Sequence, residues 1–119
     1  MKKILIVEDN EKNMYFMNFL LKKNNYEVIK AASGNVGVRI ALEESPDLIL
    51  MDIQLPDIDG LKAAGLIRES EADKKIPIIA VTSYTMSGDR ERLIRDGFTG
   101  YVEKPINIKD FLSEIKKYL

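Results

Sequence analysis

Four apolar segments of the 119-residue sequence each end in side chains that can do chemistry: Glu8-Asp9, Asp52, Thr82 and Lys104. If one fold brings these segment ends together, three carboxylates meet. Each pair of carboxylates about 5 Å apart then costs about 3 kcal/mol at an effective dielectric constant near 20. A divalent cation offsets that repulsion, and a set of oxygen ligands without histidine or cysteine favours Mg²⁺.

A magnesium site combined with a lysine and a hydroxyl is typical of phosphoryl transfer. Lys104 supplies a positive charge and a donor for phosphate oxygens, and Thr82 supplies the hydroxyl. An aspartate can itself be the nucleophile. Asp52 is the candidate, because the run LILM before it is the most apolar and so predicts a central strand. Glu8 and Asp9 are candidate metal ligands.

The composition limits the other chemistry that this chain can do. It has no histidine, which excludes imidazole catalysis, histidine metal ligands and a phosphohistidine on this chain. It has no cysteine, which excludes disulfides and thiol chemistry, and its net charge of −1 gives no general attraction to nucleic acid or anionic membranes. No apolar run approaches the roughly 20 residues of a membrane span and no signal peptide is evident, so we expect a cytoplasmic protein.

Short apolar runs alternate with longer amphipathic segments, which predicts alternating strands and helices. The expected strands are Lys2–Glu8, Tyr26–Ala32, Asp47–Asp52, Ile76–Ser83 and Thr99–Lys104, the second of them at an exposed edge. The expected helices are one around Met14–Leu21 closed by Asn24-Asn25, one from the N-cap Ser33 to Glu44, then Leu61–Ser70 and Asp89–Asp96, and one from the N-cap Asn107 to the last residue.

Five strand–helix units predict an α/β fold with a doubly wound parallel sheet that helices cover on both faces. A barrel would need eight such units. In a doubly wound fold, ligands bind beyond the carboxyl ends of the strands, where the acids, the hydroxyl and the lysine lie. We expect residues 1–119 to form one domain, with no segment left for an output domain.

Four motifs on four of the expected strands resemble the receiver domain of two-component response regulators. They are Glu8-Asp9-Asn10, the run Leu48–Gly60 around Asp52, Val81-Thr82-Ser83, and Gly100–Pro105. The match covers the whole chain in the right order and spacing. The segments EDNEKN and MDIQLPDIDG most resemble receivers used in phosphorelays, both stand-alone cell-cycle regulators and the receivers of hybrid kinases. The resemblance implies a flavodoxin-like sheet of five strands in the order 2-1-3-4-5 with five helices.

The resemblance also implies a role for each matching residue at the acidic site. Asp52 matches the aspartate that accepts the phosphoryl group. Asp9 matches a direct Mg²⁺ ligand, Glu8 an acid that acts mostly through water, and the backbone carbonyl of Gln54 a third protein ligand of the metal. Aspartate is also frequent in the family where this chain has Glu8, so we expect the metal geometry to shift without being lost.

Other matching residues are those that respond to the phosphoryl group. Thr82 matches the switch hydroxyl, Tyr101 the aromatic residue that turns inward, and Lys104 the family's lysine. The peptide bond between Lys104 and Pro105 is cis in similar proteins. Ser83 departs from the alanine that is common after the switch hydroxyl, which would slightly alter access to the phosphoryl group.

As a whole, the resemblance implies a signalling protein and not a turnover enzyme. A histidine kinase, a histidine phosphotransferase or a small phosphodonor would phosphorylate Asp52 with Mg²⁺, and slow hydrolysis would remove the group. Gln54 and Tyr84 would border the path of the attacking water. A downstream protein would recognise a changed face within residues 89–119. The chain is expected to be a monomer, with dimerisation on phosphorylation as an open alternative.

Each of these residues has a plainer interpretation when it is taken alone. Asp9 or Asn10 could cap the first helix, Thr82 could be structural, Lys104 could be a solvated charge, and Tyr101 could be a core aromatic residue with a wet hydroxyl. The occurrence of four motifs on four strands favours the functional interpretation for the acids, the hydroxyl and the lysine. The later acids Asp57 and Asp59 we interpret as turn and N-cap residues without chemistry.

Three rival functions remain for comparison. A phosphohydrolase of the haloacid dehalogenase type also uses an aspartate at a strand end, but it needs a second acid two residues later, where this chain has Gln54. An interaction module with the same fold and no phosphorylation would not need the intact set of site residues. A nucleotide-binding protein would need a phosphate-cradling glycine loop, which the sequence lacks.

Overall fold

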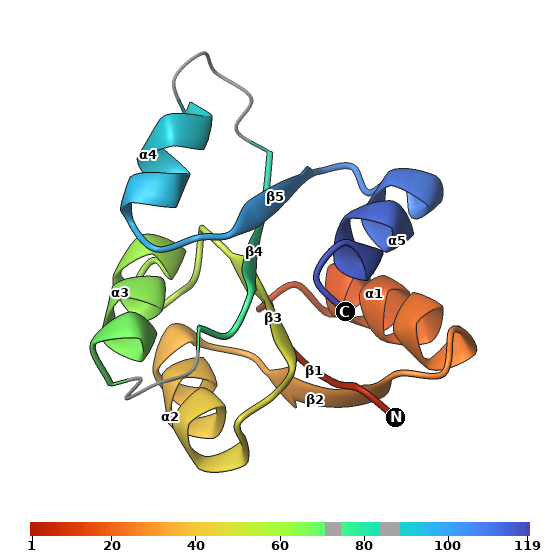
Figure 1. Ribbon diagram of the computed structural model, residues 1–119, viewed down its shortest axis with the longest axis horizontal. Coiled ribbons are helices and arrows are strands. Elements are labelled where there is room, and N and C mark those ends of the chain that lie inside the picture. Colours follow the sequence, from red (N-terminus) through yellow and green to blue (C-terminus); the bar gives the residue numbers. More distant parts are fainter. Residues whose placement is uncertain (71–74, 84–88) are drawn as a thin grey trace.

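The computed structural model describes residues 1–70, 75–83 and 89–119, with the side chains of 89 and 90 left aside. Within these residues, parallel strands form one five-stranded sheet in the order β2-β1-β3-β4-β5 (Figure 1). The strands are β1 (Lys3–Val7), β2 (Glu27–Ala31), β3 (Leu48–Asp52), β4 (Ile78–Thr82) and β5 (Gly100–Glu103). The predicted doubly wound sheet and its strand order are confirmed.

Helices cover both faces of this sheet (Figure 1). They are α1 (Glu11–Lys23), α2 (Gly34–Glu44), α3 (Gly60–Ser70), α4 (Asp89–Arg95) and α5 (Ile108–Lys116). Side chains of α1 and α5 join the hydrophobic cluster on one face, and side chains of α2, α3 and α4 join the cluster on the other. None of the helices in the described ranges combines the length and the apolar character needed to cross a bilayer.

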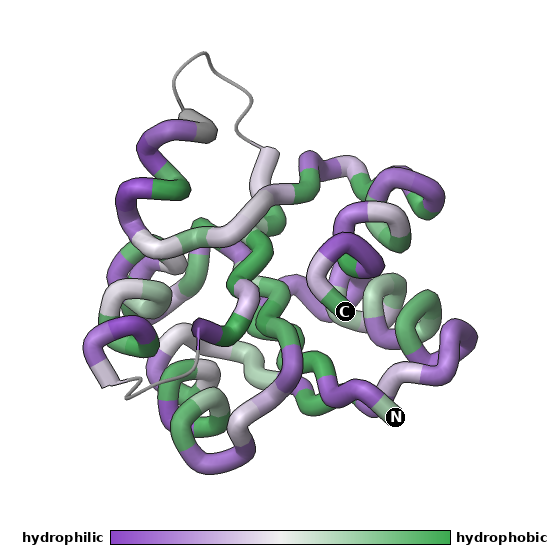
Figure 2. Tube along the Cα trace, viewed as in Figure 1, coloured by the Kyte–Doolittle hydropathy of each residue, from purple (hydrophilic) through white to green (hydrophobic). Residues whose placement is uncertain are grey.

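The two clusters bury the central strands on both sides. Every residue of β3 and β4 is buried, whereas β2 is buried only at Ala31 and is exposed at Glu27 and Lys30. Figure 2 shows the same contrast, with continuous hydrophobic colouring through the middle of the sheet. A strand buried on both faces needs an unbroken apolar run, which is why LILM precedes Asp52. The predicted central place of β3 and edge place of β2 are confirmed.

Short polar side chains begin three of the helices. Asn10, Ser33 and Asn107 each accept a hydrogen bond from the backbone N–H three residues later, which satisfies a donor that the helix cannot. The predicted caps at Ser33 and Asn107 are therefore confirmed. Asn10 caps α1, as its plainer interpretation holds.

Most predicted boundaries differ from the observed ones by no more than one residue, and two are wrong by more than that. β4 begins at Ile78 and not at Ile76, because Pro77 has no N–H to give to a neighbouring strand. α5 ends at Lys116, and the last residues continue as a turn and not as helix. Both errors are at element ends, where local pattern is weakest.

Gly60 lets α3 start directly against the end of β3. A Cβ at this position would collide with the carbonyl oxygen of Asp52 and lie 2.8 Å from the Cα of Ile53. These are backbone atoms, so they cannot move without displacing Asp52. We expect Gly60→Ala to lower the free energy of unfolding by about 2–3 kcal/mol.

Gly65 provides the matched control in the same helix, because a Cβ there would meet nothing within 4 Å. Gly65→Ala is expected to raise the free energy of unfolding by up to about 1 kcal/mol through helix propensity. Urea titrations of both variants measure the difference. Similar effects of the two substitutions would contradict the account of Gly60.

Candidate functional site

Asp52 is placed by the middle strand of the sheet. β3 pairs with β1 on one side and with β4 on the other, where Asp52 lies in register with Val81. The Asp52 side chain is only 8% exposed, and its Oδ1 accepts a hydrogen bond from the backbone N–H of Gln54 at 3.2 Å. The apolar run therefore presents one carboxylate at a rigid strand end.

Glu8 and Asp9 come from the end of β1, next to Asp52. The Glu8 side chain is fully buried, and its Oε2 accepts a hydrogen bond from the backbone N–H of Asn10 at 3.2 Å. Asp9 is exposed. One carboxylate oxygen from each of Glu8, Asp9 and Asp52 lies within 4.8 Å of the others. The fold thus brings together the three acids that the sequence places on two separate strands.

Lys104 reaches these acids from the residue after β5. Its Nζ lies 3.0 Å from Oε1 of Glu8 and 3.4 Å from Oδ1 of Asp52. The Lys104 backbone N–H donates to the carbonyl of Thr82 at 2.8 Å, and the Lys104–Pro105 peptide bond is cis, as the resemblance implies. One ammonium beside three carboxylates leaves two negative charges in excess, which matches a divalent cation.

The Glu8 carboxylate is buried among other charged groups, and both its pKa and its hydrogen bonding reflect this. Burial raises the pKa of the Glu8 carboxyl, the neighbouring Asp52 raises it further, and Lys104 acts in the opposite direction. Oε1 of Glu8 is buried, and despite its ion pair with Lys104 it receives no well-directed hydrogen bond from the residues that the structure describes. A buried oxygen with an available lone pair, among other carboxylate oxygens, suits Mg²⁺. The cluster suits an aspartyl phosphate only together with such a cation, because its carboxylates alone would repel the phosphoryl oxygens.

The remaining predicted residues surround this cluster at different distances. Thr82 is buried at the end of β4, the strand between Asp52 and Lys104, and Ser83 after it is exposed. Gln54, whose backbone N–H donates to Asp52, is an exposed residue. Tyr101 is partly buried on β5 and packs with the cluster under α2, α3 and α4, so it lies one strand farther out. Tyr84 lies outside the described residues.

Asp57 and Asp59 make structural contacts. Asp59 accepts a hydrogen bond from the backbone N–H of Lys62 at 2.8 Å and so caps α3. Asp57 accepts hydrogen bonds from the backbone N–H groups of Gly34 and Asn35, each at 2.8 Å, and the bond from Asn35 is the largest of the effects that lower the pKa of Asp57. Asp57 therefore ties the loop after β3 to the first turn of α2. Sequence reasoning missed this contact, which joins residues more than 20 positions apart.

The comparison with known protein families agrees with this geometry. Residues 4–116 match the family model described as the response regulator receiver domain. The chain belongs to this family. The resemblance predicted from the four motifs is thereby confirmed, and the chain is a receiver of two-component signalling.

Several individual proteins resemble this receiver over nearly its whole length. It is 44% identical over 118 residues to the polar-differentiation response regulator DivK of Brucella ovis, covering 99% of this chain and 96% of that protein. The receiver domain of sensor histidine kinase PA1611 from Pseudomonas aeruginosa is 35% identical, with a TM-score of 0.89 and coverage of 98% and 96%, and holds a magnesium ion in its active-site cleft. The chemotaxis protein CheY4 of Vibrio cholerae is 28% identical, with a TM-score of 0.91 and coverage of 100% and 99%.

Burial of Glu8 beside a second acid predicts a stability of the folded receiver that depends on pH. The pKa of Glu8 in the folded receiver lies above its ordinary value of 4.5, so the folded state binds more protons between the two values. The stability that this group contributes is present below pH 4.5 and is lost as the pH rises through the folded pKa. We expect Asp52→Asn to raise the free energy of unfolding without Mg²⁺ by about 1–2 kcal/mol near pH 8.

The gain in stability should shrink toward pH 4, because the Glu8 carboxyl of folded wild type is then protonated and no longer repels Asp52. Urea titrations in the presence of a chelator, at both pH values, measure it. A gain that does not depend on pH, or a loss of stability, would contradict the proposed repulsion. Adding Mg²⁺ should raise the stability of wild type more than that of the variant.

Proposed function

We propose that this receiver is a signalling phosphoacceptor in which Asp52 takes a phosphoryl group from a histidine kinase or a histidine phosphotransferase, with Mg²⁺ as cofactor. The observation that carries the proposal is the meeting of Glu8, Asp9 and Asp52 within 4.8 Å, with the Lys104 ammonium 3.4 Å from Asp52. This arrangement supports a carboxylate nucleophile, and a small phosphodonor would serve as an alternative source of the group.

The metal would be held by Asp9, Asp52 and the backbone carbonyl of Gln54, with Glu8 acting through water. Bound there, Mg²⁺ would neutralise charge on the phosphoryl oxygens. A carboxylate oxygen of Asp52 forms the new bond to phosphorus while the bond from phosphorus to the donor's imidazole nitrogen breaks, and the imidazole leaves with the electron pair. Lys104 reduces the repulsion between Asp52 and the incoming anion.

The transferred group then acts as the signal. It adds a charge of about −1.5 to −2 at the end of β3. Thr82 at the end of the neighbouring β4 and Lys104 after β5 would donate hydrogen bonds to it. Moving a two-state switch from 1:99 to 99:1 takes about 5.5 kcal/mol. Two or three charge-assisted hydrogen bonds of about 1.5–3 kcal/mol each would supply that amount. Tyr101 on β5 would change position together with Thr82.

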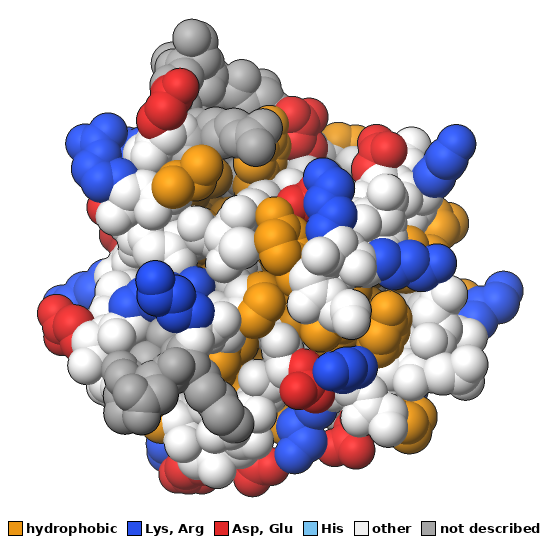
Figure 3. Space-filling view, in the orientation of Figure 1, with side chains coloured by type: hydrophobic (Ala, Val, Ile, Leu, Met, Phe, Trp, Pro, Cys, Tyr) orange, Lys and Arg blue, Asp and Glu red, His pale blue; other side chains and the backbone are white. Residues whose placement is uncertain are grey.

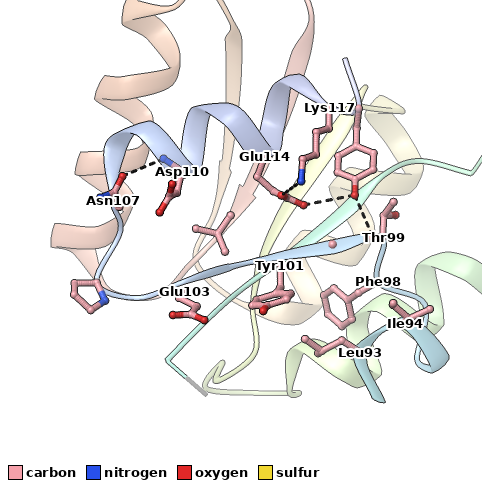
Figure 4. A pocket seen from close by; sticks show the side chains of 14 residues that line it. Leu93, Ile94, Phe98, Thr99, Tyr101, Glu103, Asn107, Asp110, Glu114 and Lys117 are labelled. Carbon is pink, nitrogen blue, oxygen red and sulfur yellow. Dashed lines mark hydrogen bonds and ion pairs between the residues drawn. The ribbon is translucent and has the colours of Figure 1, made fainter. Parts of the chain in front are cut away.

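The changed face would be the one formed by α4, β5 and α5. A groove of about 440 Å³ lies on this face, with residues of α4 on one side and of α5 on the other (Figure 4). A downstream protein would bind here, and phosphorylation-dependent pairing of two otherwise monomeric receivers is the alternative use of the same face. The proposal places the receiver in the cytoplasm with its kinase, and involves neither nucleic acid nor membrane.

The amide side chain of Gln54 favours slow hydrolysis of a phosphoryl group on Asp52. Gln54 stands two residues after Asp52, where a dehalogenase-type phosphohydrolase needs an acid to protonate the leaving group and activate water. An amide side chain does neither. We therefore propose slow loss of the phosphoryl group as part of the signal, with Gln54 and Tyr84 beside the path of water.

Labelling of Asp52 tests the proposed function. Wild type incubated with a radiolabelled small phosphodonor and Mg²⁺ should become labelled, and a chelator should prevent the labelling. Asp52→Asn should lose the label because its amide is not a nucleophile. Asp59→Asn is the matched control, since Asp59 belongs to the same loop and asparagine still caps α3. Equal labelling of the two variants would sink the assignment.

The role of Thr82 is tested separately from phosphorylation. Thr82→Ala should still be labelled. Without the hydroxyl, the ratio of active to inactive conformations in the phosphorylated receiver should fall by about tenfold. Thr82→Ser keeps the hydroxyl and should behave like wild type. Amide NMR shifts in β5 and α5 on phosphorylation measure this ratio. A full response by Thr82→Ala would remove Thr82 from the switch.

A further inference from the structure

Among the residues that the structure describes, no strand pairs with the outer edge of β5. β5 ends the sheet, and along a parallel strand the backbone N–H and C=O groups of alternate residues point to opposite edges. The Lys104 N–H donates to the carbonyl of Thr82, so the groups of Val102 also face β4, and those of Tyr101 and Glu103 face outward. No hydrogen-bond partner for these outward groups lies within residues 1–70, 75–83 or 89–119.

The groove on this face runs along the open edge. All four residues of β5 line it. Figure 4 shows different chemistry on its two walls: Leu93, Ile94, Phe98 and Tyr101 lie on the α4 side, and Asn107, Asp110, Glu114 and Lys117 lie on the α5 side. Ile94 is 53% exposed. In Figure 3, hydrophobic side chains reach the surface in the middle of this view, over β5.

The α5 wall is acidic, and contacts with neighbouring side chains hold one of its carboxylates in place. Oε1 of Glu114 lies 2.9 Å from Nζ of Lys117, and Oε2 of Glu114 lies 3.5 Å from the hydroxyl of Tyr118. A Cβ on Gly100 would collide with the Glu114 carboxylate, so this acid is seated directly against β5. Asp110 and Glu114 line the α5 side of the groove together with Lys117. Glu103, which shares the face of β5 with Tyr101, adds a third acid to the lining, so negative charge is in excess.

We propose that this groove binds an extended segment of a partner protein, which pairs with β5 as a sixth strand and alternates apolar with basic side chains. Successive side chains of a strand point to opposite faces, so the apolar ones would meet the α4 wall and the basic ones Asp110 and Glu114. The backbone of the segment would bond to the outward groups of Tyr101 and Glu103, as in other cases of strand addition.

A second copy of β5 does not fit this pattern. Its sequence GYVE contains no basic residue and would bring a second Glu103 to an already acidic groove. The proposed occupant is therefore a segment of a different protein and not a second β5. The use of this binding as output rests on the function proposed above, but the binding itself requires only the groove and is tested without a phosphodonor.

The probe is a blocked seven-residue peptide of alternating valine and lysine. Added to the unphosphorylated receiver, it should slow hydrogen exchange of the Tyr101 and Glu103 amides at least about tenfold at saturation, while the β4-facing amide of Val102 changes little. A peptide of the same composition with its lysines and valines in separate blocks should bind at least about tenfold more weakly, as should alternating valine and glutamate. No peptide binding, or binding without protection of both amides, would overturn the proposal.

Backbone methylation separates strand pairing from charge attraction. In one peptide all valine amides are N-methylated, and in a second all lysine amides. Only one of the two sets of amides faces β5, so only one peptide should lose binding, whereas equal affinities would overturn the pairing.

Variants of the receiver test the acidic side of the groove. Asp110→Asn should weaken binding of the unmethylated peptide several-fold. Glu91→Gln changes an exposed acid of α4 that does not line the groove, and it should leave the affinity unchanged. Peptide binding to the groove and Mg²⁺-dependent labelling of Asp52 are measured in separate experiments. Loss of peptide binding with normal labelling would therefore overturn only the groove proposal, and loss of labelling with normal peptide binding would overturn only the proposed function.

Discussion

Repulsion among three carboxylates at the ends of β1 and β3 is the constraint on which the rest of this site depends. Glu8 and Asp52 are buried and Asp9 lies beside them, so water screens their charges poorly. Lys104 offsets one charge and leaves a place for a divalent cation. Burial of Glu8, and after it the neighbouring Asp52, raises the pKa of Glu8. A further anion on Asp52, as proposed above, would add to the negative charge of this site. The proposed metal binding and the proposed signalling would thus be two consequences of one arrangement.

The fold resists that repulsion through rigid backbone around Asp52. β3 is buried along its whole length and hydrogen-bonded on both sides, so the carboxylate has little freedom to retreat. Gly60 packs α3 directly against the Asp52 carbonyl, and Asp57 ties the following loop to α2. A strained charge cluster at a rigid strand end stores free energy that a ligand can release. A flexible loop would relax the strain instead.

The strands, the N-caps and the acidic edge could be predicted from the sequence because each has a local cause. LILM before Asp52 needs burial on both faces, and Ser33 and Asn107 cap whatever helix follows them. The meeting of Glu8, Asp9, Asp52, Thr82 and Lys104 was predicted by placing four strand ends at one edge of the sheet. The roles of Gln54 and Tyr101 were implied only by the resemblance to receiver domains. The contact of Asp57 with α2 and the unlike walls of the β5 groove could not be predicted, because they arise only when distant segments meet.

The central claim is that, among acids crowded into one site, Asp52 alone carries the phosphoryl group. Borohydride reduces an aspartyl phosphate to homoserine, so treatment of the phosphorylated receiver followed by peptide mass mapping identifies the modified residue directly. Homoserine is expected at position 52, and only when Mg²⁺ is present during phosphorylation. Homoserine at Asp9 or Asp57 with an unmodified Asp52, or modification that does not depend on Mg²⁺, would contradict it.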